Sequence, residues 1–292
     1  MPKILITGSK SFVGTNFRKF SKFKNIEEIS LYDIRPENID FSNFDVVLHL
    51  AAIVHQTRNI SESEYMKVNR DLCLKVAESA KRGGVGQFIF LSSLKVYGDS
   101  KLFTEIRNEE SECLPVDPYG KSKYGAEVNL KKLEDTDFTV SIIRPPLIYG
   151  EGVKANMLSL IKLVDKFPIL PFDAIQNKRN YLYIENLIGY IDRIIDRKAS
   201  GIFIVKDKNA LSTTELVNYL SKNLGRKLIL FKMPGFFKKI GTYLFPLVFD
   251  RLFGSSEFDN SKTNQQLDYK PQISTEDGIR NSVMSYRSRE KS

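Results

Sequence analysis

Ile4-Leu5-Ile6-Thr7-Gly8-Ser9-Lys10-Ser11-Phe12-Val13-Gly14 stands near the start of the 292-residue chain and decides its fold. Residues 4–7 have the continuous apolar character of a buried strand, and apolar residues recur at helical spacing over residues 12–23. The turn between them carries glycine at both ends. A strand, a glycine-containing turn and a helix in this order favour a phosphate site, because helix N-terminal amides point at the ligand.

Each position of this turn has an expected part in holding a dinucleotide. Gly8 permits the tight turn, and Gly14 lets the helix pack closely against the strand. Ser11 stands where a middle glycine is usual, which predicts a less close approach of the backbone to pyrophosphate. The residues expected to contact the cofactor are Gly8, Ser11, Phe12, Val13 and Gly14. Taken alone, the same pattern also fits an ordinary strand–turn–helix connection.

The choice between NAD and NADP is predicted from the residues after the second expected strand. Asp33 follows Gly14 by about 20 residues, where a carboxylate accepts hydrogen bonds from the adenosine ribose hydroxyls. This favours NAD. Arg35 offers an alternative, since a guanidinium there can pair with a 2′-phosphate, so NADP also remains open.

Strands and helices alternate through the first half of the chain. Strand-like runs are predicted at residues 28–32, 45–50, 87–91 and 139–143, and helices at residues 65–82 and 119–133. This alternation is typical of βαβ units and predicts an α/β fold with a doubly wound parallel sheet of the Rossmann type. The apolar character of the runs fits strands that are covered on both faces.

The alternation breaks after Gly150, where proline and aromatic residues become frequent. A smaller C-terminal α/β lobe that holds the substrate is expected there. Residues 1–149 are predicted to form the dinucleotide-binding domain, with residues 181–206 returning to it. Residues 150–180 and 207–292 are predicted to form the second lobe.

Composition and charge limit the class of protein. Hydrophobic residues make up 42% of the chain and charged residues 27%, as in globular proteins. The two cysteines cannot build a disulfide framework, no apolar run reaches about 18 residues, and no signal peptide is visible. These features predict a cytoplasmic protein. The net charge of +9 suits an anionic ligand such as a diphosphate, while no nucleic-acid-binding motif is present.

Tyr119-Gly120-Lys121-Ser122-Lys123 is the most informative stretch for chemistry. Pro118 marks a helix start, so Tyr119 and Lys123 fall one turn apart on the same face. A tyrosine hydroxyl has a pKa near ~10, too high for efficient proton transfer at neutral pH. The Lys123 ammonium and a nicotinamide cation are expected to lower that pKa, which would make Tyr119 a general acid and base.

Ser93 completes the predicted catalytic set. It lies in Ser92-Ser93-Leu94-Lys95-Val96-Tyr97-Gly98, directly after the fourth expected strand. Open α/β sheets bind ligands at the carboxyl ends of their strands. The Ser93 hydroxyl is therefore expected to hydrogen-bond the substrate oxygen and orient it toward Tyr119.

These segments resemble the extended short-chain dehydrogenases/reductases of the nucleotide-sugar epimerase/dehydratase family. The resemblance covers nearly the whole chain, including DVVLHLAA at residues 45–52 and RPPLIYG at residues 144–150. It implies that Ser93, Tyr119 and Lys123 are catalytic. It also implies cofactor contacts at Leu50, Ala51, Ala52, Asn69, Pro146 and Leu147, in addition to Tyr119 and Lys123.

The resemblance also implies a substrate site for a nucleotide diphosphate sugar. Asn156 and Arg179 match family positions that hold the diphosphate, and Arg251 is a candidate for a second arginine. A guanidinium suits phosphate oxygens because its donors bind in pairs. His55 is expected to face the sugar and His49 to pack beneath the cofactor. Neither histidine has a partner at metal-ligand spacing, so no metal site is predicted.

Several reactions remain open, and the residues rank them. Leu94 and Lys95 occupy the places of a dehydratase Asp-Glu pair, which argues against dehydration. Leu147 replaces a substrate asparagine of many epimerases. The closest likeness is to reductases of UDP-4-keto-6-deoxy-N-acetylhexosamines, including UDP-N-acetylquinovosamine dehydrogenases of surface-polysaccharide pathways. A 4-epimerase with tightly bound NAD is the alternative, and a non-catalytic dinucleotide-binding protein is the second.

Two expectations concern partners. The resemblance implies a homodimer formed through paired helices. The stretch over residues 234–254 is basic and rich in aromatic residues, so it could touch a membrane surface. The roof of the substrate lobe is the interpretation preferred here for that stretch.

Overall fold

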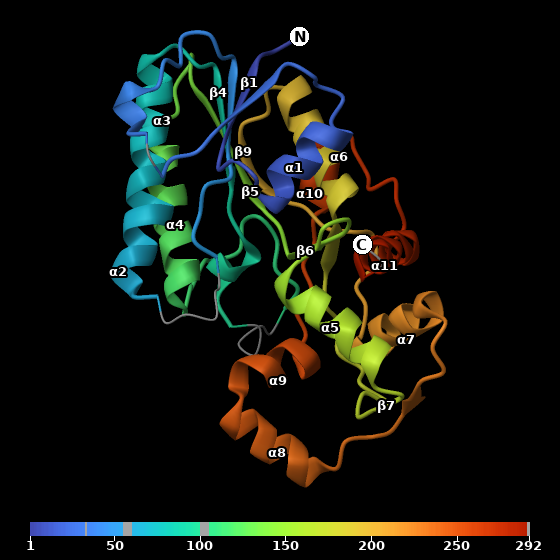
Figure 1. Cartoon of the computed structure of the whole chain (residues 1–292). Coiled ribbons are helices and arrows are strands. Elements are labelled where there is room, and N and C mark those ends of the chain that lie inside the picture. The colour runs from blue at the N-terminus through green and yellow to red at the C-terminus, as the bar shows by residue number, and fades with distance from the viewer. Residues whose placement is uncertain (33, 55–59, 100–104, 291–292) are drawn as a thin grey trace.

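The computed structural model describes residues 1–32, 34–54, 60–99 and 105–290. A six-stranded parallel sheet lies at its centre, in the order β2-β1-β3-β4-β5-β9 (Figure 1). The strands are β1 Ile4–Thr7, β2 Ile26–Ile29, β3 Val46–His49, β4 Gln87–Leu91, β5 Thr139–Arg144 and β9 Gly201–Ile204. The expected parallel, Rossmann-like α/β sheet is therefore confirmed.

Helices cover both faces of the sheet. One face packs against α1 (Phe12–Phe20) and α6 (Ile184–Asp196), and the other against α3 (Cys73–Arg82) and α4 (Pro118–Lys131) (Figure 1). Ile4 and Ile6 of β1 point into the first core, whereas Leu5 points into the second. Because alternate residues of a strand face opposite sides, burial on both sides accounts for the continuous apolar runs.

The strand order changes direction between β1 and β3. The chain leaves β1 for β2 on one side and returns past β1 to β3 on the other. Open α/β sheets bind ligands at such a switch point, outside the carboxyl ends of the strands. The glycine turn after β1 and the segment after β3 therefore lie together.

The second lobe is built from short strands and helices. Two small parallel sheets pair β6 (Leu147–Tyr149) with β8 (Tyr181–Tyr183) and β7 (Ile169–Leu170) with β10 (Ile229–Leu230). Its helices are α5 Ala155–Lys166, α7 Thr213–Leu224, α8 Gly235–Leu244, α9 Pro246–Phe253 and α11 Thr275–Glu290, while α10 Ser261–Leu267 contacts α6 and β9. Among the described residues, no helix is both long and apolar enough to span a bilayer.

Element boundaries differ from the sequence-based expectations in three places. The second strand runs over Ile26–Ile29 and ends before the predicted stretch of residues 28–32 is complete. The predicted helix at residues 65–82 is interrupted, because α2 (Glu62–Tyr65) passes through a π-helical segment, Met66–Leu72, into α3. Within the stretch of residues 181–206, β9 joins the six-stranded sheet and α6 packs on α1, whereas β8 pairs with β6 outside the main sheet.

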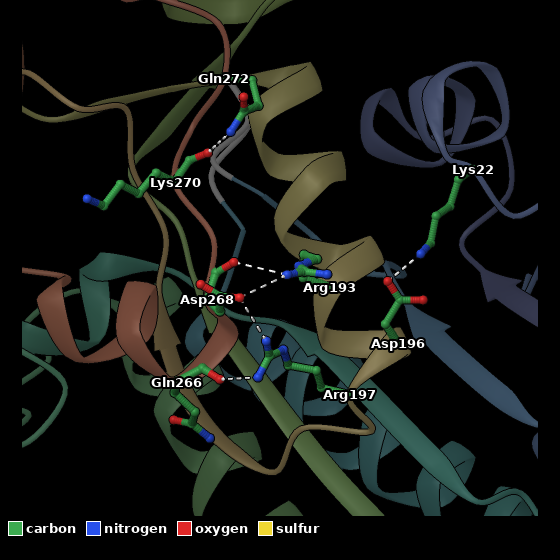
Figure 2. Close-up of polar contacts among 8 residues, drawn as sticks. All are labelled: Lys22, Arg193, Asp196, Arg197, Gln266, Asp268, Lys270 and Gln272. Atoms are coloured by element: carbon green, nitrogen blue, oxygen red, sulfur yellow. Dashed lines mark hydrogen bonds and ion pairs between the residues drawn. The ribbon is translucent and has the colours of Figure 1, made fainter.

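Exposed ion pairs link α6 to the segment after α1 and to the residue after α10. Arg193 and Arg197 both contact Asp268, which follows α10, and Lys22 pairs with Asp196 at the end of α6 (Figure 2). Such exposed pairs contribute little each, about 0–1 kcal/mol. The position of α6 is fixed mainly by its buried apolar face.

Asp207 is a buried carboxylate that joins the two lobes. It accepts hydrogen bonds from the Tyr183 backbone N–H, from Asn186 Nδ2 and from the Tyr149 hydroxyl. Burial raises the pKa of this carboxyl to about 6, although these donors oppose the shift. The negative charge that Asp207 carries at neutral pH therefore destabilises the folded state.

We expect the pH dependence of stability to change in Asp207→Asn. The folded carboxyl binds its proton more tightly than the unfolded one, so it stabilises the fold as pH falls from about 6 to about 4. About two pKa units correspond to roughly 3 kcal/mol. Urea unfolding at pH 7 and pH 4 should show the wild type gaining that much relative to Asp207→Asn. Identical pH profiles of the two proteins would contradict this role.

Candidate active site

The turn after β1 is shaped to hold a ligand against the backbone. Gly8 has φ +98°, and a Cβ there would lie 2.6 Å from the Ala51 backbone nitrogen. Leu50 N in turn donates to Thr7 O at 2.9 Å, which fixes the segment after β3 against the turn. Only glycine fits this close crossing of two strand ends.

Ser11 has a different part from the one expected at the middle of the turn. It is the N-cap of α1, where its hydroxyl accepts a hydrogen bond from Gly14 N at 3.1 Å. Its φ of −70° needs no glycine. The first-turn amides of Phe12 and Val13 have no helical carbonyl to bond and remain suited to phosphate oxygens. These residues fit the pyrophosphate of a dinucleotide.

Asn69 is a buried residue that positions the segment after β3. Its side chain is fully buried; its oxygen accepts from Ile53 N at 2.8 Å, and its amide donates to Ile53 O and to Ser122 Oγ. Asn69 thereby ties the segment after β3 to α4. The predicted cofactor contact of Asn69 stays a prediction, and the structure gives the residue a positioning role.

His49 lies beneath the turn, at the end of β3. Its Nδ1 is 2.7 Å from Thr7 Oγ1, and its ring stacks on Phe88. Burial lowers the pKa of His49 to about 3, so the imidazole is neutral. Asp33 and His55, predicted to bind the ribose and the sugar, lie outside the described residues.

Ser93 and Tyr119 meet at the carboxyl end of β4. Ser93 caps the short 3₁₀ helix Leu94–Tyr97, and its hydroxyl accepts from Lys95 N at 3.2 Å. A hydrogen bond with Ser93 lowers the pKa of Tyr119, but burial outweighs it and raises that pKa to about 12. The chain by itself therefore keeps Tyr119 protonated at neutral pH.

Gly120 allows this meeting of α4 and the 3₁₀ helix. A Cβ on Gly120 would lie 2.7 Å from the Lys95 carbonyl oxygen, so a side chain there would push the two apart. Asp117 caps α4 by accepting from Gly120 N at 2.7 Å, and it also lies 3.4 Å from Lys95 Nζ. The start of α4 is thus held beside Ser93.

Lys123 lies one turn after Tyr119, as expected, and is almost fully buried. Its Nζ donates to the Leu91 carbonyl at 2.8 Å and lies 4.5 Å from the centre of the Phe90 ring. Burial lowers the pKa of Lys123 to about 8, so most of the ammonium remains charged at neutral pH. In the chain alone, burial dominates and raises the pKa of Tyr119, so the lowering expected from Lys123 together with a nicotinamide cation stays a prediction.

A buried ion pair supports this site and was missed in the sequence analysis. Arg144 at the end of β5 donates from Nε and Nη2 to the carboxylate of Glu127 on α4, at 3.1 Å and 2.5 Å. Ser92 donates to the same carboxylate at 2.5 Å, and Arg144 also donates to the Tyr97 hydroxyl. Glu127 stands one turn beyond Lys123 on the same face of α4. That spacing could have indicated from the sequence that Glu127 is buried beside the site.

The expected substrate residues gather around α9. Arg251 Nη1 donates to Asn156 Oδ1 at 3.0 Å. Arg179 Nη1 donates to the carbonyls of Asp250 and Gly254 at 2.9 Å each, and so caps the C-terminus of α9. Both arginines are half-buried and lie in one region, although each already has a protein partner.

The structure defines a Rossmann-like α/β chain, and comparison with known proteins shows its family. Residues 4–205 match the model of the NAD dependent epimerase/dehydratase family, and the chain belongs to that family. The family is NAD-dependent, in agreement with the cofactor expected from the turn after β1. A UDP-glucose 4-epimerase of Vibrio cholerae is 35% identical over 316 residues, covering 98% of this chain and 96% of that protein.

Two further proteins are similar along most of their length. The N-acetyl-alpha-D-glucosaminyl-diphospho-ditrans,octacis-undecaprenol 4-epimerase of Escherichia coli O157:H7 is 28% identical, covering 84% of this chain and 79% of that protein. The crystal structure of a dTDP-4-dehydrorhamnose reductase from Clostridium acetobutylicum has a TM-score of 0.77 at 21% identity, covering 98% of this chain and 99% of that one. The last comparison concerns the fold alone.

We expect Glu127→Gln to destabilise the fold strongly. The substitution leaves the Arg144 guanidinium buried and uncompensated, and breaking one partner of a buried pair costs about 3–5 kcal/mol. Denaturant unfolding measures this loss. Glu62→Gln is the control, because its pair with Lys121 is exposed and should change stability by less than about 1 kcal/mol. Equal effects of the two substitutions would contradict the role of the buried pair.

Proposed function

We propose that this chain oxidises and reduces carbon 4 of a sugar that is linked to a diphosphate. The arrangement of Ser93, Tyr119 and Lys123 beside the turn at Gly8 carries this proposal. It combines a proton donor and acceptor, a polarising hydroxyl and a buried cation at the carboxyl end of β4, on the same edge of the sheet as the switch point.

The residues act on the proton and on the position of the sugar. A bound NAD would supply the hydride acceptor and a positive charge to the site. Tyr119 takes the proton of the carbon-4 hydroxyl during oxidation and returns it during reduction. Ser93 shares its hydrogen bond with the sugar oxygen, which orients carbon 4. Lys123, held by the Leu91 carbonyl, keeps a cation near the reacting end of α4.

The reaction that we propose first is 4-epimerisation. Two relatives that align along most of this chain are named as 4-epimerases, one of them at 35% identity. In such a reaction the same Tyr119 serves both half-reactions, and the cofactor is regenerated within the site. The hydride removed from carbon 4 returns to its opposite face after the 4-keto sugar has turned in the site, so no cofactor is consumed overall.

Reduction of a UDP-linked 4-keto-6-deoxy-N-acetylhexosamine for surface polysaccharide synthesis is the second candidate. Leu147 on β6 favours it, because this residue is 37% exposed and provides no side-chain amide where many epimerases have asparagine. Lys95 argues against dehydration but does not separate reduction from epimerisation. Its ammonium, paired with Asp117, stands where a dehydratase has a carboxylate. A reductase would consume NADH or NADPH stoichiometrically.

The group that carries the sugar is proposed to be held near α9. Arg251 and Asn156 form one hydrogen-bonded unit there, and Arg179 lies at the end of the same helix. A diphosphate is common to a UDP-sugar and to the undecaprenol-linked sugar named for the Escherichia coli relative. We propose a UDP-sugar as the substrate to test first. We also propose that the protein is a homodimer when it binds this substrate.

Tyr119→Phe should abolish turnover, because only the transferable proton is lost. Affinity for NAD and for the sugar nucleotide should stay nearly unchanged, since the ring and its neighbours remain. Steady-state kinetics and calorimetric titration of both ligands check the two statements. An active Tyr119→Phe protein would refute the proposed mechanism, whichever of the two reactions is correct.

Ser93→Ala should lower kcat by about 10²-fold to 10³-fold, the usual effect of losing one polarising donor. The smaller loss is expected because Tyr119 still transfers the proton. Ser42→Ala is the control: its exposed hydroxyl donates to Asp40 just before β3, at the amino end of the sheet, whereas Ser93 lies at the carboxyl end. A reduction of the same size in both variants would show that Ser93 has no special part in the reaction.

Cofactor use separates the two candidate reactions. UDP-N-acetylglucosamine or UDP-glucose with no added cofactor should be converted to its carbon-4 epimer, with no net NADH formed. A UDP-4-keto-6-deoxy-N-acetylhexosamine with NADH or NADPH tests the second candidate in parallel. Product identification with consumption of one reduced cofactor per sugar would overturn the epimerase in favour of the reductase.

A further inference from the structure

The α8–α9 hairpin presents a large apolar surface to solvent. In Figure 1 it forms the end of the molecule farthest from the six-stranded sheet, and its two helices pack on one another. Gly241 on α8 lies against the Phe249 ring, and this contact closes the hairpin. The exposed apolar side chains are Phe236, Phe237, Ile240, Tyr243, Leu244, Phe245 and Val248.

These side chains are too many and too close together to be scattered surface residues. Phe236 is 69% exposed, Phe237 61% and Tyr243 86%, all on one ten-residue helix. Single exposed apolar residues are normal, but a contiguous patch marks an interaction site. If α8 covered the substrate lobe, its aromatic face would be buried against that lobe. Instead, Gly241 is the buried residue of α8.

The charge of the same region specifies the partner. Residues 216–249 contain no aspartate or glutamate, and Lys232 and Lys239 are exposed at the two ends of the aromatic pair. Lys238 lies over the Phe253 ring, 4.8 Å from its centre. Aromatic residues beside lysines are typical of helices that lie in the headgroup region of an anionic bilayer.

The opposite side of the hairpin contacts the predicted diphosphate site. Arg179 caps the C-terminus of α9, and Arg251 of α9 is bonded to Asn156. A surface that rests on lipid headgroups would therefore lie one helix away from these cations. A second copy of this chain is a poorer occupant, because the two basic patches would repel one another.

We propose that the α8–α9 hairpin docks on the surface of an anionic lipid bilayer. The aromatic side chains enter the interface and the lysines bind the headgroups. This docking goes beyond the proposed carbon-4 chemistry and does not depend on it.

Vesicle flotation tests the proposal directly. Wild-type protein should bind vesicles of phosphatidylglycerol mixed with phosphatidylcholine, and should bind pure phosphatidylcholine at least about tenfold more weakly. Binding to the anionic vesicles should weaken as salt rises. No binding to the anionic vesicles, or equal binding to both, would overturn the proposal.

Two variants and their controls locate the surface. Phe236→Ser/Phe237→Ser should lower vesicle affinity at least about tenfold, since two rings no longer enter the interface. Met284→Ser, at a residue 63% exposed on α11, should bind like the wild type. Lys232→Glu/Lys239→Glu should also lose at least about tenfold, whereas Lys75→Glu/Lys270→Glu makes the same change of charge elsewhere and should lose much less.

Activity and mass measurements separate this proposal from its alternatives. Turnover of a soluble UDP-sugar should be unchanged in the patch variants, so a failed docking test and a failed activity test are distinguishable. Light scattering of wild type and Phe236→Ser/Phe237→Ser should give the same molar mass. A lower mass in that variant would assign the patch to contact between copies and overturn the membrane proposal.

Discussion

The buried ion pair between Arg144 and Glu127 is the constraint on which the active site depends. It joins the end of β5 to the middle of α4, and Ser92 and Tyr97 bind the same two charged groups. A charge taken out of water is tolerated only with a closely bonded partner, so these segments have one low-energy arrangement. Ser93 follows Ser92 directly, and its place relative to α4 is set by this network.

Electrostatics in the site are governed by burial. Burial raises the pKa of Tyr119 to about 12 and lowers that of Lys123 to about 8, so both groups resist the charged form. The phenolate of Tyr119 is therefore scarcely populated at neutral pH in the chain alone, and a positively charged cofactor would favour it. His49, close to the same turn, has a pKa of about 3 and is a neutral packing residue.

One apolar core joins the two lobes. It runs from the face of the sheet under α1 and α6 into α5, α7 and α11, while a separate core fills the other face of the sheet. Buried polar contacts such as those of Asp207 add to this junction. The α8–α9 hairpin lies outside it, with one buried glycine in α8, and Arg179 and Arg251 bond α9 to the rest of the chain.

The sequence alone determined the parallel sheet, the turn at Gly8 and the spacing of Tyr119 and Lys123, because these depend on local periodicity and on residues near one another in the chain. It did not reveal the pairing of β8 with β6, the pair of Arg144 with Glu127, or the capping of α9 by Arg179. Those contacts join residues far apart in the chain. Only the tertiary structure decides them, because burial and hydrogen-bond partners are set by how the elements pack, and the same packing raises the pKa of Tyr119 in the chain alone.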